Sequence, residues 1–92
     1  MCKIFFHKYS MKVIDMKDYN PGMGVLISLE DSEDFIPIKN SINLKLSKIL
    51  DNPSKYLNKE DTYYFYCARG SRSRRAVEIL SVYGYNVVKV TK

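Results

Sequence analysis

The sequence has 92 residues, of which 46% are hydrophobic and 27% are charged. These values are typical of one small folded domain over residues 1–92 and exclude a disordered chain or a two-domain enzyme. The net charge of +5 first suggests nucleic acid as a partner, but all four arginines lie within residues 69–75, and the lysines nearly balance the carboxylates. The excess charge therefore belongs to one short segment, and we do not expect nucleic acid as a partner.

Apolar, β-branched or aromatic runs predict strands at 4–6, 25–29, 63–66 and 87–90, with a weaker candidate at 12–14. Between the two middle strands, apolar residues at helical spacing predict a helix over 44–50, with Asn43 as its cap. Pro53 suits the first position of a further short helix.

The clearest helix is predicted from Ser71 to Tyr83. Its apolar residues recur at i, i+3, i+4 and i+7, and Gly84 is placed to end it. The alternation of strands and helices predicts an α/β domain with a mostly parallel central sheet and short flanking helices. Cys67 then lies at the carboxyl end of the aromatic strand, where open α/β sheets usually bind their ligands.

The two cysteines, Cys2 and Cys67, are far apart and belong to no Cys/His cluster. This spacing predicts neither a disulfide framework nor a metal site. The apolar run at the N-terminus is too short for a signal peptide, and no stretch approaches the roughly 18 apolar residues of a membrane span. We therefore expect free thiols, no membrane association and a cytoplasmic location, and we assign Cys2 no role.

The loop after Cys67 combines a thiol with groups that bind anions. A thiol is a good nucleophile as the thiolate, which a helix N-terminus and nearby guanidinium groups stabilise. Gly70 permits a tight loop whose N–H groups, from Ala68 to Ser73, can turn toward one centre. Arginine adds bidentate hydrogen bonds to oxyanions. The loop therefore predicts a reactive cysteine and an anionic substrate.

At these residues the sequence resembles the rhodanese family of sulfurtransferases. The family pattern has an apolar strand, Cys, a six-residue loop with Gly at its fourth place and often Arg at its sixth, and then Ser, a helix and Gly-Tyr before a strand. This chain is similar to that pattern at Tyr64-Phe65-Tyr66-Cys67, Gly70, Arg72, Ser73, Ala76, Leu80, Gly84-Tyr85 and Val88. Upstream, Ile38–Leu44 is similar to a second family segment, with Asn40 at a glycine place where positive φ is tolerated.

The resemblance implies a three-layer rhodanese-like domain and a ping-pong sulfur transfer without a cofactor. Cys67 would be the catalytic nucleophile, taking sulfur from a small anionic donor such as thiosulfate and passing it to a thiol or protein acceptor. The substrate-binding residues implied are Ala68, Arg69, Gly70, Ser71, Arg72 and Ser73. The chain is a minimal version that ends at Lys92, soon after the last strand. The acidic residue and the arginine usual after the preceding strand are replaced by Ser28 and Glu30, so part of the usual support is missing.

Two other functions stay open at this stage. A cysteine-dependent phosphatase or arsenate reductase uses a similar loop, but its pattern places five residues between Cys and Arg, whereas Cys67 and Arg72 enclose four. A non-enzymatic sulfur carrier or anion-binding or partner-binding module is the second alternative, with Arg74 and Arg75 either exposed to solvent or docking a partner.

The remaining residue clusters carry no predicted chemistry. The acidic residues Glu30, Asp31, Glu33 and Asp34 are expected to form a solvated turn and not a metal or acid–base site. The tyrosines are expected to pack in the core, while Tyr83 and Tyr85 could border the cysteine site.

Overall fold

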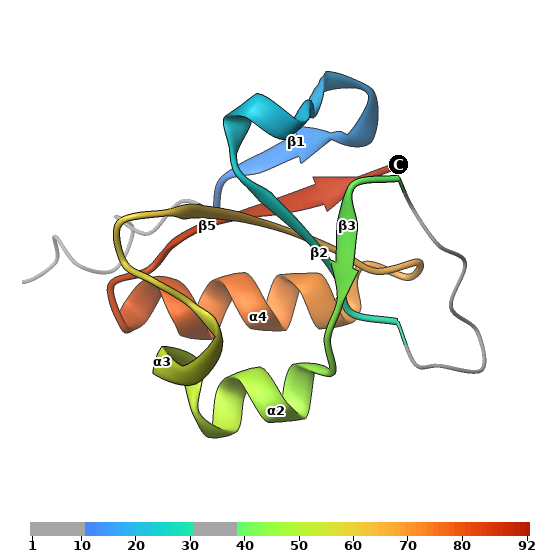
Figure 1. Ribbon diagram of the computed structural model, residues 1–92. Helices are drawn as coiled ribbons and strands as arrows, with labels where there is room; N and C mark the ends of the chain where they lie inside the picture. Colours follow the sequence, from blue (N-terminus) through green and yellow to red (C-terminus); the bar gives the residue numbers. More distant parts are fainter. Residues whose placement is uncertain (1–10, 31–38) are drawn as a thin grey trace, which may run out of the picture.

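The structure, a computed structural model, describes residues 11–30 and 39–92. Five parallel strands form one sheet in the order β1-β5-β4-β2-β3 (Figure 1). Their bounds are β1 Val13–Asp15, β2 Val25–Ser28, β3 Ser41–Asn43, β4 Thr62–Tyr66 and β5 Asn86–Thr91. The expected α/β class is confirmed, and the sheet is entirely parallel. The predicted strand at 4–6 and Cys2 lie outside the described residues.

The central strand, β4, is buried on both faces. Tyr63 and Phe65 belong to the core beneath the helices, whereas Tyr64 and Tyr66 belong to the core on the other face. A continuous apolar run is typical of a parallel strand covered on both sides. The same run ends at Cys67, so the strand that anchors the sheet also fixes the position of the thiol.

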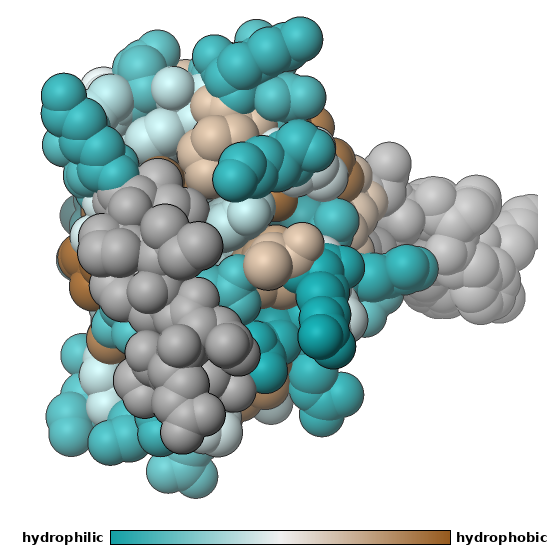
Figure 2. All heavy atoms as spheres, turned by 90° about the vertical axis from the view of Figure 1, so that its right-hand side faces the viewer, coloured by the Kyte–Doolittle hydropathy of each residue, from teal (hydrophilic) through white to brown (hydrophobic). Residues whose placement is uncertain are grey.

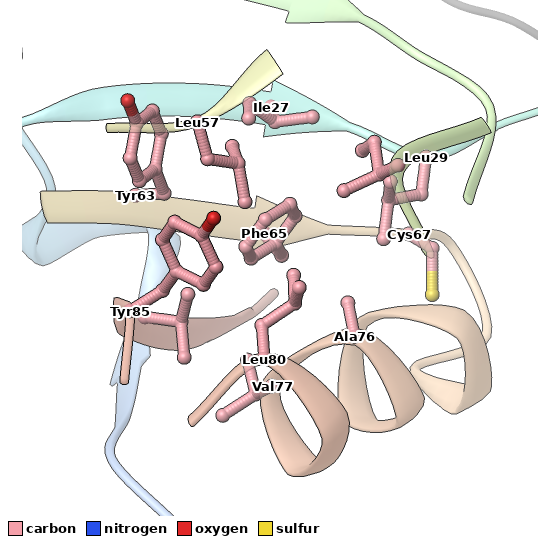
Figure 3. Packing of buried hydrophobic residues seen from close by; sticks show 12 residues of the cluster. Ile27, Leu29, Leu57, Tyr63, Phe65, Cys67, Ala76, Val77, Leu80 and Tyr85 are labelled. Carbon is pink, nitrogen blue, oxygen red and sulfur yellow. The ribbon is translucent and has the colours of Figure 1, made fainter. Parts of the chain in front are cut away.

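Three α-helices cover one face of the sheet: α2 Leu46–Asp51, α3 Pro53–Tyr56 and α4 Ser71–Val82 (Figure 1). Helix α4 buries Ala76, Val77 and Leu80 against the sheet, each at most 1% exposed, and Figure 3 shows Ala76 and Leu80 directed toward the strand that carries Phe65. Residues in and beside two short 3-10 helices, η1 Met16–Asp18 and η2 Pro21–Met23, pack against the opposite face. The part of the chain that the structure describes has no helix of sufficient length and apolarity to cross a membrane.

The helices confirm most of the boundaries predicted from the sequence. Pro53 occupies the first position of α3. Helix α4 ends at Val82, and Gly84 follows its cap with φ +96°, a conformation that glycine adopts without strain. Asn40 has φ +69°, as expected for the glycine place that it occupies.

One strand was missed, and the residue expected as a cap has another role. Asn43 is the last residue of β3, and the cap position of α2 falls to Lys45, whose side chain makes no capping bond. The predicted Asn43 cap is therefore wrong. Its side-chain amide instead donates to the backbone carbonyls of Ser28 and Glu30, at 3.2 and 3.0 Å. Asn43 thus ties the edge strand to the chain that follows β2.

Candidate functional site

Cys67 lies at the carboxyl edge of the sheet, between the end of β4 and the start of α4. Figure 3 shows its sulfur directed toward the first turn of α4, and the residue is only 4% exposed. Gly70 holds the N-cap position of α4 with φ +83° and ψ −14°. A residue with a Cβ is strained in this left-handed conformation, so glycine allows the loop to turn tightly from strand to helix.

Ser73 contacts the sulfur through both its backbone and its side chain. Its N–H donates to Cys67 Sγ at 3.2 Å, and its hydroxyl lies 3.5 Å from the same atom. The hydroxyl also donates to the Gly70 carbonyl at 3.2 Å, and Ser73 is fully buried. The first turn of α4 therefore holds one N–H as a donor at the sulfur, while the Ser73 hydroxyl accepts from the Cys67 thiol. A helix N-terminus and an N–H donor both favour a negative charge at that atom.

A cavity of about 370 Å³ opens beside the thiol. Its lining comes from Glu30, Cys67, Ala68, Arg69, Ser71 and Arg72. The structure thus places most of the predicted loop residues around one cavity, while Gly70 and Ser73 shape the loop behind it. Figure 2 views the molecule from the carboxyl edge of the sheet, and hydrophilic side chains predominate among the described residues on this face. Such a cavity suits a small polar or charged ligand.

Glu30 is the residue of this site that the sequence interpretation missed. It is 8% exposed, and its carboxylate accepts a hydrogen bond from the Ala68 N–H. The other carboxylate oxygen lies 3.4 Å from Arg72 Nη1. The expected solvated turn is therefore wrong for Glu30, because the carboxylate packs against the cysteine loop. The neighbouring residues Asp31, Glu33 and Asp34 lie outside the described residues.

Comparison with known proteins agrees with the loop geometry. The family model of the rhodanese-like domain matches residues 12–92. The chain belongs to the rhodanese family. A rhodanese-related protein from Thermoplasma volcanium is 32% identical, with a TM-score of 0.76, over 87% of this chain and 83% of that one. No curated protein matches the chain.

Two further solved structures extend the likeness. The protein SSP1007 from Staphylococcus saprophyticus is 29% identical, with a TM-score of 0.71, over 88% of this chain and 87% of that one. An NAD-dependent persulfide reductase from A. fulgidus is 20% identical, with a TM-score of 0.70, over 89% of this chain but 15% of that one. At this identity, the second likeness shows the shared fold alone.

Within this rhodanese domain, several residues considered from the sequence lie away from the cavity. Arg74 and Arg75 are exposed on α4, and Arg74 Nε lies 3.4 Å from Glu78, one helical turn onward. Tyr83 and Tyr85 follow the far end of α4, and Tyr85 lines a different cavity. The idea that these tyrosines border the cysteine site is therefore wrong.

The rhodanese site also differs from the family pattern at the end of β2. Ser28, at the place of the usual acidic residue, is fully buried, and its hydroxyl has no hydrogen-bond partner among the described residues. Glu30, at the place of the usual arginine, puts a negative charge where that pattern has a positive one. Within residues 11–30 and 39–92, no three His, Cys, Asp or Glu side chains are grouped to hold a metal ion.

Proposed function

We propose that this chain is a sulfurtransferase that carries sulfane sulfur as a persulfide on Cys67. The observation that supports this most directly is the contact of Cys67 Sγ with the Ser73 N–H and hydroxyl, at the wall of a polar cavity. A backbone N–H fixed at a sulfur stabilises both a thiolate and a persulfide anion, and the Ser73 hydroxyl can turn to donate once the thiol has lost its proton. Membership of the rhodanese family supports the same chemistry.

The first half-reaction loads the cysteine. With thiosulfate as the anionic donor, the Cys67 thiolate attacks the outer sulfur and a new S–S bond forms at Sγ. The S–S bond of the donor breaks, and sulfite leaves with its electron pair. Arg69 and Arg72 line the cavity and are the guanidinium groups that would contact an anionic donor or leaving group.

The second half-reaction removes the sulfur from Cys67. A nucleophilic acceptor, such as a small thiol or a protein thiolate, attacks the outer sulfur of the persulfide, and the Cys67 thiolate leaves. The persulfide of each cycle is consumed and the thiolate is regenerated, so the transfer needs no metal, organic cofactor or external oxidant. A reducing cytoplasm suits this cycle, because free Cys67 is its starting point.

The proposal is tested by intact-mass measurement after incubation with thiosulfate, and separately with an organic thiosulfonate. We expect an adduct of about 32 Da that disappears on reduction, the mass of one persulfide sulfur. Cys67→Ser should lose the adduct and Cys2→Ser, the matched control, should keep it. An equal adduct on Cys67→Ser, or no adduct from either donor, would contradict the proposal.

The phosphatase alternative has its own readout. Hydrolysis of an aryl phosphate that disappears in Cys67→Ser would indicate that the same loop attacks phosphorus. We expect no such hydrolysis, because Cys67 and Arg72 enclose four residues and form a smaller loop than the phosphatase pattern requires.

A further inference from the structure

The cysteine cavity already contains a negative charge from the protein itself. Glu30 accepts a hydrogen bond from the Ala68 N–H and lies 3.4 Å from Arg72. Both groups belong to the loop that the sequence predicted to bind an anionic substrate. An anionic donor that enters this cavity therefore meets a carboxylate on the same donors that it would use.

Three contacts fix the backbone around Glu30. The Leu29 N–H donates to the Tyr66 carbonyl at 2.9 Å, which continues the pairing of β2 with β4. The Asn43 amide then bonds the carbonyls of both Ser28 and Glu30. Glu30 is 8% exposed, so its carboxylate is held at the site and is not a freely moving surface charge. A positioned charge acts on a bound ligand more strongly than a mobile, solvated one.

The charge of the donor decides how strongly Glu30 opposes it. Thiosulfate carries two negative charges, and its leaving group, sulfite, carries two as well. A thiosulfonate carries one, and its leaving group is a singly charged sulfinate. A protonated persulfide carries none at its sulfur atoms, and its leaving group is a thiolate. Repulsion between like charges in a partly enclosed cavity rises with the charge of the donor.

We propose that Glu30 is a specificity-determining residue that disfavours dianionic donors and directs the site toward sulfane-sulfur donors whose leaving group has at most one negative charge, such as a thiosulfonate or a persulfide. The inference rests on the proposed sulfur transfer and names its donor class. Loading from a thiosulfonate balances in the same way as loading from thiosulfate. The Cys67 thiolate bonds to the outer sulfur, the donor S–S bond breaks, and the sulfinate leaves with the electron pair.

The test compares two donors that differ mainly in charge. The rate of Cys67 persulfide formation is measured by intact mass at subsaturating thiosulfate and at subsaturating methanethiosulfonate. Glu30→Gln removes the charge and keeps an oxygen able to accept from the Ala68 N–H. Glu78→Gln is the matched control, since Glu78 is a half-exposed carboxylate on α4 that pairs with Arg74 away from the cavity.

In Glu30→Gln, the thiosulfate rate should rise relative to the methanethiosulfonate rate by about tenfold, the factor expected for one unit charge in a partly exposed site. The ratio should stay at its wild-type value in Glu78→Gln and close to it in Glu30→Asp, which keeps the charge. The rate at which a thiol acceptor unloads the persulfide should change much less. This second rate distinguishes the role in donor choice from a merely structural defect, which would slow both half-reactions.

The outcomes separate the two proposals. If both donors load Cys67 but the ratio is the same in wild type and Glu30→Gln, the role of Glu30 is overturned and the sulfur transfer stands. A wild type that already prefers thiosulfate to methanethiosulfonate would also overturn it. If neither donor loads Cys67 in any variant, the proposed function itself fails, and the donor class fails with it.

Discussion

The Ser73 hydroxyl offers a sharp test of how the loop activates the thiol. Ser73→Ala removes the hydroxyl that lies 3.5 Å from Cys67 Sγ but keeps the backbone N–H at 3.2 Å. The hydroxyl accepts from the Cys67 thiol, and once the thiol has lost its proton the hydroxyl can turn and donate to the thiolate, so the variant loses that second donor. A hydrogen bond to a charged group contributes about 1.5–3 kcal/mol, and the long distance favours the lower end. We therefore expect persulfide formation to slow by about tenfold.

The stability of the fold should change little in this variant. The Gly70 carbonyl, which accepts from the Ser73 hydroxyl, also accepts from the Arg74 N–H at 3.1 Å and so keeps a partner. Alanine also has a higher helix propensity than serine. The free energy of unfolding, measured by chemical denaturation, should therefore stay within about 1 kcal/mol of the wild type.

Ser81→Ala is a matched control on the same helix. The Ser81 hydroxyl donates to the Glu78 carbonyl at 3.2 Å, the same bond to the residue three positions earlier that Ser73 makes to Gly70. The control removes an equivalent hydroxyl far from the sulfur, so its rate of persulfide formation should equal that of the wild type. A wild-type rate in Ser73→Ala, or an equal decrease in both variants, would refute the role given to this hydroxyl.

Three further substitutions test separate parts of the structure. Gly70→Ala should lower the free energy of unfolding by about 1–2 kcal/mol, because φ is +83°, and should also slow persulfide formation. Gly84→Ala, at φ +96°, is the control: it should destabilise the fold similarly but form the persulfide at the wild-type rate. Ser28→Ala should leave the unfolding free energy unchanged or raise it by up to about 1 kcal/mol, since it removes a buried hydroxyl without a described partner; a clear loss would contradict this. Arg74→Ala should change stability by less than about 0.5 kcal/mol in denaturation and leave loading unchanged, because its ion pair is exposed; a slower loading rate would show that Arg74 acts on the donor.

The parts of the fold that were predictable are those whose residues carry their own pattern. The apolar run of β4 and the helical spacing from Ala76 to Tyr83 are local, and both elements form where the sequence indicates. Strand β3 is different, since Ser41-Ile42-Asn43 is short, largely polar and exposed at the sheet edge. It is a strand because β2 provides the backbone partners, which no local pattern reveals.

In the candidate site, too, the residues with a local sequence pattern were predictable and those placed by the sheet were not. The loop from Cys67 to Ser73 is contiguous, so its chemistry could be recognised from the sequence. Glu30 lies in an acidic stretch that indicates a solvated turn when taken alone. Its contacts with Ala68 and Arg72 span 38 and 42 residues and exist only because β2 lies beside β4. Burial of that carboxylate is a property of the assembled sheet, beyond the reach of local pattern.

In the proposed cycle, Cys67 itself carries the transferred sulfur. The most direct measurement loads the protein from a donor labelled with heavy sulfur at its outer atom, blocks the persulfide by alkylation, and locates the label by peptide mass spectrometry. We expect the label on the peptide that contains Cys67, and its transfer to the acceptor product when a thiol is added before alkylation. Label on Cys2, or label on Cys67 that an acceptor does not remove, would contradict this cycle.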